Sequence, residues 1–495
     1  MDHPMSTMAD ASEIIAAFPS DDPVRAAQDA TQWLDSITNN GIFPLAHRYD
    51  VLDLIDIAIK RHGQRLLDQY LALKPQAKFQ EGLLWRAATG MWKGLGDAYL
   101  GCLSQVHQDK TAAAAFRKRL PQLIARAMRM QVLQIKWILM RYGYVNDVYW
   151  TAVAYLYTQA ETGQFLDEVV EIYAGAHGTG TVRQEFLRTL MLGVSSTGGL
   201  SPVKQNIAER AIAHFSMDFI SATRPMPGAN FLIDLKGGMS PARVLAEAPS
   251  GARLFYFGAG PALDAVLKAV DAVNETGALP SDMNLQSAAS VDTAADTLLH
   301  LAFNWEKELP ARDSERRKVA TTLQITHGFD GVLALGANVI QETWVVENAS
   351  AEGYGIIVPA RRGEWLQVGV LIGFLPEGES PTWGAGVVRR VETDARGQRR
   401  VGVQVLSRSV VVGTMCTLRA SGERAVPHNV VLLDAKPSRS GYLQGLLRPE
   451  AFTLRDALEA TRTMDGKTFE VMPSGLVESG PDFDRVRFKL VEAPA

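Results

Sequence analysis

The 495-residue chain has little cysteine, no long hydrophobic run and no strong excess of charge of either sign. Its two cysteines, Cys102 and Cys416, lie far apart, which excludes a disulfide-stapled scaffold and a cysteine-based zinc site. No stretch approaches the roughly 18 uncharged apolar residues of a membrane helix, and the N-terminus lacks the pattern of a signal peptide. We therefore expect a cytoplasmic protein without a membrane span.

Basic and acidic side chains nearly cancel. The chain has 50 Lys and Arg against 54 Asp and Glu, a formal net charge of -4. This balance argues against a protein that coats a nucleic-acid polymer and against a polybasic membrane anchor. An anionic ligand would have to be met by a local cluster of basic residues.

Signatures of enzymes are equally scarce. The sequence has no His-Glu-x-x-His zinc helix, no Gly-x-Ser-x-Gly elbow and no Cys-x-x-Cys pair. Asp465-Gly-Lys-Thr468 imitates the end of a phosphate-binding loop, but Thr461 stands where the first glycine is required. We therefore predict a protein that is not an enzyme, with no catalytic residue, no metal site and no cofactor.

What the sequence does contain is an ordinary globular composition, with 47% hydrophobic and 21% charged residues. At about 150 residues per domain, the length predicts roughly three domains. The fold class predicted is α+β multidomain: a large all-helical region, then an antiparallel β-barrel, then a C-terminal β-rich extension. The predicted segments are 1–224 (helical bundle or solenoid), 225–310 (small mixed α/β insert and connecting helices), 311–420 (barrel) and 421–495 (extension or second small barrel).

Helical periodicity dominates the first segment. Asp21-Asp22-Pro23 is typical of a helix start, and the stretch from Asp50 carries apolar residues on one stripe, as an amphipathic helix requires. Strand patterns dominate after Arg312, where short β-favouring runs alternate with glycine-rich turns. Val332-Leu-Ala-Leu335 is one predicted strand, Thr414–Leu418 is predicted to be a late strand of the barrel, and 454–461 is predicted to be a short helix.

One constellation in the barrel segment suits an anionic ligand. Arg312-Asp-Ser-Glu-Arg316 precedes the first predicted strand, in which Val319, Thr321, Leu323 and Ile325 alternate, and Asn348-Ala-Ser350-Ala-Glu-Gly353 forms a turn between two later strands. Guanidinium groups offer planar pairs of donors to phosphates and to the O6/N7 edge of guanine. Asn348 and Ser350 supply polar groups for a base edge, and Gly353 permits a close backbone approach or a turn with φ > 0.

At these residues the sequence resembles the PilZ domain, a bacterial barrel family whose members bind cyclic di-GMP through an Arg-x-x-x-Arg segment and an Asp/Asn-x-Ser-x-x-Gly segment. The likeness covers about residues 312 to 420 and does not extend to the helical region. It implies that Arg312 and Arg316 hold phosphate and guanine, while Asn348, Ser350 and Gly353 line the guanine pocket. Arg317 follows Arg316 directly and is a further candidate for phosphate. Asn348 replaces the more common aspartate of the family motif.

The resemblance implies a bacterial second-messenger receptor. Cyclic di-GMP bound at the barrel would be coupled to the helical region, and through it to a partner protein. An alternative is an interaction scaffold whose degenerate barrel binds no nucleotide. A further alternative is an enzyme whose site lies in the helical region or the 225–261 insert, with Asp234, Lys236 or His214 as its polar groups.

Overall fold

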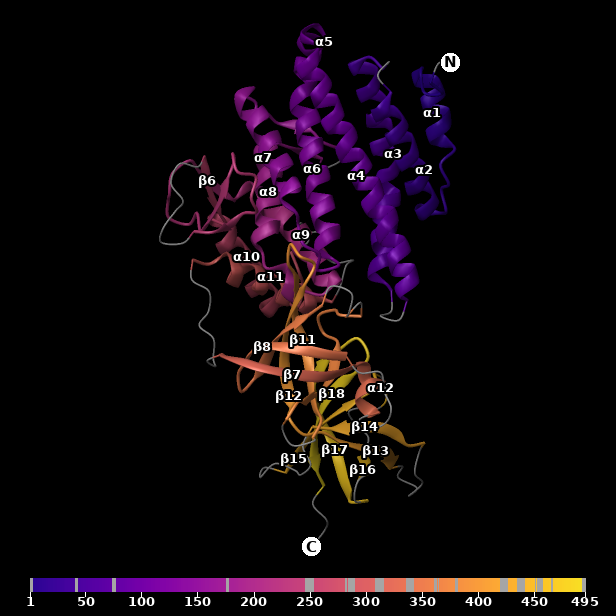
Figure 1. Cartoon of the computed structure of the whole chain (residues 1–495), viewed down its shortest axis with the longest axis vertical. Helices are drawn as coiled ribbons and strands as arrows, with labels where there is room; N and C mark the ends of the chain where they lie inside the picture. The colour runs from indigo at the N-terminus through magenta and orange to yellow at the C-terminus, as the bar shows by residue number, and fades with distance from the viewer. Residues whose placement is uncertain are drawn as a thin grey trace. The chain divides into compact units, whose positions relative to one another are not determined.

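The chain divides into two compact units, described here from a computed structural model (Figure 1). The helical unit comprises Met1–Thr197 and Pro202–Pro310, and the barrel unit comprises Gly198–Ser201 and Ala311–Ala495. The predicted segments 1–224 and 225–310 thus share one unit, and 311–420 and 421–495 share the other. The structure describes residues 3–40, 43–73, 77–174, 178–244, 253–280, 283, 290–307, 316–334, 342–359, 363, 365–378, 382–418, 426–433, 441–449, 451, 457–463 and 466–491.

The first part of the helical unit is a layer of long helices, in which α4 packs against α2, α3 and α6. The helix predicted at Asp21-Asp22-Pro23 is confirmed, because Asp22 caps α2 by accepting hydrogen bonds from the backbone N–H groups of Val24 and Arg25. The helices are α1 (Met8–Ala16), α2 (Pro23–Asn39), α3 (Leu45–Leu71), α4 (Lys78–Gln108), α5 (Lys110–Phe116), α6 (Leu120–Leu139), α7 (Asp147–Thr162), α8 (Val182–Val194), α9 (Pro202–His214), α10 (Pro261–Thr276) and α11 (Val291–Trp305).

Two small sheets complete this unit. β1 (Val170–Glu171) pairs with β2 (Thr179–Gly180), and an antiparallel sheet has the order β3-β6-β4-β5. Strands β4, β5 and β6 lie in the predicted mixed segment 225–310, whereas β3 lies in the segment 1–224 that was predicted to be helical. Asp234 serves a turn there, since its Oδ1 accepts from the backbone N–H of Lys236 at 2.9 Å. The sheet strands are β3 (Ile220–Ala222), β4 (Phe231–Asp234), β5 (Ala242–Arg243) and β6 (Leu254–Gly258).

The two cysteines are free thiols in different units. Cys102 is buried on α4, and burial raises the pKa of its thiol to about 12, so it packs as a small apolar group. Within the part of the chain that the structure describes, no helix is both long enough and apolar enough to cross a membrane.

The barrel unit contains two closed six-stranded barrels. The first has the cyclic order β10-β11-β12-β9-β8-β7, with all neighbours antiparallel. A short helix, α12 (Gly328–Leu333), occupies the place where the sequence predicted a strand at 332–335. The strands of the first barrel are β7 (Arg317–His327), β8 (Glu342–Ala349), β9 (Gly353–Val358), β10 (Leu371–Pro376), β11 (Gly384–Thr393) and β12 (Arg399–Ser407).

A bulge in β7 alters the expected alternation of side chains. Leu323 and Ile325 are buried as predicted, but Val319 is exposed. The register against β8 shifts between Lys318 and Thr321, so one extra residue reverses which face the following side chains occupy. The bulge separates the core half of β7 from the end that carries Arg316 and Arg317.

The C-terminal segment forms the second barrel, with the cyclic order β13-β14-β15-β18-β17-β16. The run predicted as a late strand of the first barrel belongs to this second barrel, because β13 pairs with β14 and β16. The helix predicted at 454–461 is wrong over residues 457–461, which belong to strand β16, and residues 454–456 lie outside the described residues. The strands are β13 (Val411–Leu418), β14 (His428–Leu432), β15 (Tyr442–Leu447), β16 (Ala457–Arg462), β17 (Thr468–Ser479) and β18 (Asp484–Leu490).

The two barrels share a hydrophobic cluster. Phe329 and Val332 of α12 pack with Leu371 of the first barrel and with Val431 and Phe483 of the second segment. The backbone N–H of Phe329 also donates to Asp482 Oδ2 at 2.6 Å. This contact fixes the two barrels against each other within one unit.

Candidate functional site

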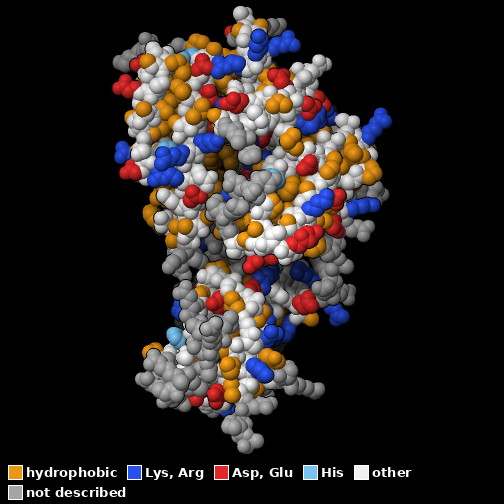
Figure 2. All heavy atoms as spheres, turned by 180° about the vertical axis from the view of Figure 1, so that it is seen from behind, with side chains coloured by type: hydrophobic (Ala, Val, Ile, Leu, Met, Phe, Trp, Pro, Cys, Tyr) orange, Lys and Arg blue, Asp and Glu red, His pale blue; other side chains and the backbone are white. Residues whose placement is uncertain are grey.

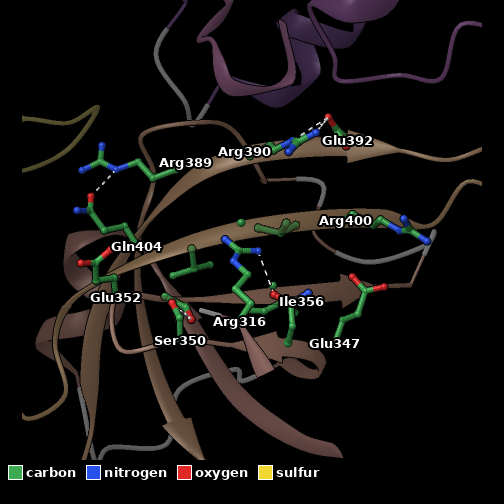
Figure 3. Close-up of a pocket in the computed structure, with 16 residues that line it drawn as sticks. Arg316, Glu347, Ser350, Glu352, Ile356, Arg389, Arg390, Glu392, Arg400 and Gln404 are labelled. Atoms are coloured by element: carbon green, nitrogen blue, oxygen red, sulfur yellow. Dashed lines mark hydrogen bonds and ion pairs between the residues drawn. The ribbon is translucent and has the colours of Figure 1, made fainter. Parts of the chain in front are cut away.

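A cavity of about 600 Å³ lies on the first barrel. It is formed by residues of β8, β9, β11 and β12 and by Arg316, which directly precedes β7. Figure 3 shows Arg316 in the middle of the group, with Arg389 toward one end and Arg400 toward the other. The residues that line it are Arg316, Glu347, Asn348, Ser350, Glu352, Gly353, Gly355, Ile356, Arg389, Arg390, Glu392, Arg400, Val401, Gly402, Val403 and Gln404.

The centre of the cavity is a contact between two residues predicted from the sequence. Arg316 Nη1 donates to Asn348 Oδ1 at 3.0 Å (Figure 3). Pairing of β7 with β8 brings them together, because Lys318 lies opposite Asn348 in the register. Arg316 is exposed, and Asn348 is an uncharged amide, so this particular contact does not neutralise the charge of the guanidinium.

Gly355 makes room for the Asn348 side chain. The two residues are register partners between β8 and β9. A Cβ on Gly355 would lie 2.5 Å from Asn348 Oδ1 and 2.8 Å from its Nδ2, closer than non-bonded atoms approach. The sequence motif did not include Gly355, yet this glycine determines where the amide sits.

The turn that follows Asn348 is held from two sides. The backbone N–H of Ser350 donates to Gly353 O at 2.8 Å, and Arg408 Nη2 donates to Ser350 O at 3.1 Å. Arg408 Nη1 also donates to the Tyr354 hydroxyl at 2.7 Å. These bonds preorganise the turn, and the Ser350 hydroxyl also donates to Gly353 O at 3.5 Å.

Gly353 allows the backbones of β9 and β12 to approach each other closely. A Cβ at this position would lie 2.2 Å from the carbonyl oxygen of Val403 on β12. Of the two reasons for a glycine that the sequence left open, the close approach of β9 to β12 is the one observed.

Three further arginines line the cavity, and the motif did not contain them. Arg389 Nε donates to Gln404 Oε1 at 2.8 Å, and its Nη2 donates to Glu478 Oε2 at 2.8 Å. Arg390 forms an ion pair with Glu392, and Arg400 is exposed on β12. The only signal in the sequence was the adjacency of arginines at 389–390 and 399–400, which is common in exposed strands.

Four arginines and three glutamates line the cavity, a balance of +1 from residues 316, 389, 390 and 400 against 347, 352 and 392. On the face of the molecule in Figure 2, basic and acidic side chains are interspersed among hydrophobic ones. Attraction for an anion therefore depends on how these arginines are placed in the cavity, since the net charge of the chain gives none.

The structure thus brings together four of the six predicted site residues: Arg316, Asn348, Ser350 and Gly353. Arg317 is the first residue of β7, opposite Ala349; it is exposed and is not part of the cavity lining. Arg312 lies outside the described residues.

Comparison with known proteins gives a match in the helical unit rather than in the barrel unit. Residues 9–220 match the family model for the N-terminal domain of the cyclic-di-GMP receptor FimW. The match covers less than half of the chain and lies in the helical unit, for which the sequence suggested no family. No curated protein matches the chain. The helical region is therefore similar to a domain of a cyclic-di-GMP receptor.

Proposed function

We propose that this protein is a cytoplasmic cyclic di-GMP receptor, that its first barrel is a PilZ-like domain, and that the barrel cavity holds the dinucleotide. The observation that carries the proposal is the contact of Arg316 with Asn348 in a cavity that three more arginines line. The match of residues 9–220 to a receptor's N-terminal domain supports the same function independently.

The cavity has the chemistry that a cyclic dinucleotide requires. Such a ligand presents phosphates, which arginine forks bind in pairs of hydrogen bonds, and guanines, whose O6/N7 edge accepts from the same groups. In this proposal Arg316 binds phosphate or guanine, while Asn348 and Ser350 meet the base edge. An aspartate at 348 would form an ion pair with Arg316, whereas the amide accepts a hydrogen bond without neutralising the arginine's charge.

The direct test is a calorimetric titration of cyclic di-GMP into the purified full-length protein. GMP, with the same base and one phosphate, serves as the comparison ligand. We expect saturable binding of cyclic di-GMP and much weaker binding of GMP, because only the dinucleotide reaches several arginines at once. A folded sample that gives no heat and no thermal shift would favour the scaffold alternative.

Gly355→Ala is expected to lower the affinity for cyclic di-GMP about tenfold, while the barrel stays folded. The added methyl group would displace Asn348, and the loss of one charge-assisted contact costs about 1.4 kcal/mol. The matched control is Gly475→Ala on β17, where a Cβ would meet nothing within 4 Å. Calorimetry on both variants checks the prediction, and equal affinities would remove Asn348 from the site.

We further propose that binding is coupled to the helical unit and, through it, to a protein partner. In the sequence, Arg316 follows soon after the boundary between the units at residues 310 and 311, and this proximity along the chain motivates the coupling. A ligand shifts such an equilibrium only by binding one arrangement more tightly than another. Small-angle scattering profiles that are identical with and without saturating ligand would rule out this coupling and leave the binding proposal standing.

A further inference from the structure

A second cavity, of about 650 Å³, lies entirely within the helical unit. It is lined by residues of α3, α4, α6, α8 and α9 and by Tyr173, and none of these residues belongs to the barrel site. Its volume is within the range of small-molecule sites, about 300–1,000 Å³. Nothing in the proposed receptor function uses it.

A chain of alternating charges, which we call the helical charge network, contributes four residues to the cavity lining: Arg129, Lys136, Arg188 and Glu209. Its fifth member, Glu185, is not part of the lining. Arg129 Nε lies 2.5 Å from Glu185 Oε2, and Arg188 Nη1 lies 3.6 Å from the same oxygen. Arg188 also pairs with Glu209, and Lys136 Nζ lies 2.8 Å from Glu209 Oε2. Three cations thus share two carboxylates, so the network carries one more positive than negative charge.

The neighbouring cations favour the ionised form of both carboxylates of the network. Burial alone would raise their pKa values, but the neighbouring cations more than offset it. Arg129 and Arg188 lower the pKa of Glu185, and Lys136 and Arg188 hold the pKa of Glu209 well below its usual range. Lys136, Arg188 and Glu209 are all more than nine-tenths buried. An excess positive charge at this depth is costly unless an anion compensates it.

Two residues that line the cavity each carry a buried donor with no acceptor among the described residues. These donors are Trp92 Nε1 and Arg188 Nε, in residues that are 6% and 8% exposed. A buried donor without an acceptor destabilises the fold, and native structures contain few such groups. Both missing partners are acceptors, which is the same deficit that the charge network shows.

The rest of the lining is basic and aromatic. Lys60 is exposed on α3, and its Nζ lies 4.4 Å from the centroid of the Tyr173 ring. Tyr173 is fixed from behind, since its hydroxyl donates to buried Asp56. Five cations line the cavity (Lys60, Arg129, Lys136, Arg188 and Arg210) against two carboxylates, Asp68 and Glu209, a balance of +3. Trp92 and Trp137 supply flat apolar surface.

We propose that this cavity is a second ligand site, which binds a small molecule with an oxyanion group, a phosphate or a carboxylate, on a flat apolar body. The oxyanion supplies the missing negative charge beside the cations that line the cavity. The apolar body lies against the aromatic side chains. The site is independent of the barrel cavity.

The test titrates full-length protein with phenyl phosphate and, in a second arm, with benzoate, followed by ligand-observed NMR. Phenol is the uncharged comparison. We expect at least one of the two anions to bind saturably at millimolar concentration and phenol to bind at least about tenfold more weakly. The stronger arm identifies the oxyanion. Failure of both anions to bind, or equal binding of phenol, would overturn the proposal.

Lys60→Glu locates the binding. Reversing this charge is expected to lower the affinity for the anion at least about fivefold. Arg61 is an exposed neighbour outside the lining, and Arg61→Glu is expected to leave the affinity within about twofold. Equal effects of the two variants would show that general surface charge attracts the anion, and would contradict a binding site in this cavity. Arg316→Ala must leave anion binding unchanged, so a failure here is distinguishable from a failure of the barrel site.

Discussion

Replacing Arg316 with alanine is expected to weaken cyclic di-GMP binding by about 10- to 100-fold. A hydrogen bond to a charged group contributes about 1.5–3 kcal/mol, and each 1.4 kcal/mol is a factor of ten in affinity. Arg316 is exposed in the free protein, and its hydrogen bond to Asn348 is to a neutral amide, so we expect truncation to remove a ligand contact at a smaller cost in fold stability than the loss of a buried ion pair. Calorimetry with the purified variant measures the loss.

The matched control for this prediction is Arg396→Ala. Arg396 is an exposed arginine between β11 and β12 and is not part of the cavity lining, so its removal changes the net charge equally and the site not at all. We expect its affinity to stay within about twofold of the unmodified protein. A loss equal to that of Arg316→Ala would mean that long-range charge, rather than the cavity, attracts the ligand.

Arg317→Ala decides between two registers of the motif. Arg317 pairs across β7 and β8 with Ala349 and stands outside the lining, whereas Arg316 reaches Asn348. Arg317→Ala is therefore expected to lower the affinity for cyclic di-GMP about threefold or less. If it costs as much as alanine at 316, the ligand uses this end of β7 in a different way from the one proposed.

Part of the candidate site was predictable because its residues are local in sequence. Arg316 and Asn348 sit at facing ends of the neighbouring strands β7 and β8, so two short motifs and a strand pattern suffice to place them together. Arg389 and Arg390 lie on β11 and Arg400 on β12; these strands are neighbours in sequence, but the register between them shifts twice. Sequence spacing cannot reveal such shifts, because each one changes which face a side chain occupies.

The elements of the fold also divide into those that local sequence signals predict and those that they do not. Long helices were predictable from apolar periodicity and capping, as at Asp22, because these signals lie within a few residues. Strand β16 was missed since its residues Ala457–Arg462 include good helix formers, and pairing with both β13 and β17 overrides that preference. The 332–335 run was ambiguous for the opposite reason, as a short apolar stretch suits a buried helix or a strand equally.

The helical charge network was beyond reach of sequence reasoning. Its members come from α6, α8 and α9, and no motif spacing relates Lys136, Arg188 and Glu209. Their juxtaposition depends on how three helices pack, which periodicity predicts only as a buried face. Yet this network gives the second large expected effect.

Glu209→Ala is expected to destabilise the helical unit by about 3–5 kcal/mol. The carboxylate accepts from both Lys136 and Arg188, all three side chains are buried, and its loss leaves three cations with the single carboxylate of Glu185. Since domain stabilities are commonly about 5–15 kcal/mol, the change is a large fraction of the total. Chemical denaturation followed by far-ultraviolet circular dichroism at the helical band measures it.

The control removes an exposed ion pair on the same unit. Asp97→Ala breaks the Lys93–Asp97 pair on α4, whose side chains are 64% and 52% exposed, and is expected to cost less than about 1 kcal/mol. Similar losses for the two variants would mean that the buried network contributes no more than a surface pair.

The stability that the helical charge network contributes is expected to depend on pH. The pKa of Glu209 is depressed in the folded protein, so its stabilisation is fully present above the unfolded-state pKa, about 4.3, and is lost as the pH falls through the folded value. The stability difference between the unmodified protein and Glu209→Gln should therefore be constant from about pH 6 to pH 8 and shrink below about pH 4.3. A stability difference that stays constant into acid would mean that Glu209→Gln loses packing or hydrogen bonds rather than charge. That result would contradict the excess positive charge assigned to the helical cavity at Lys136 and Arg188.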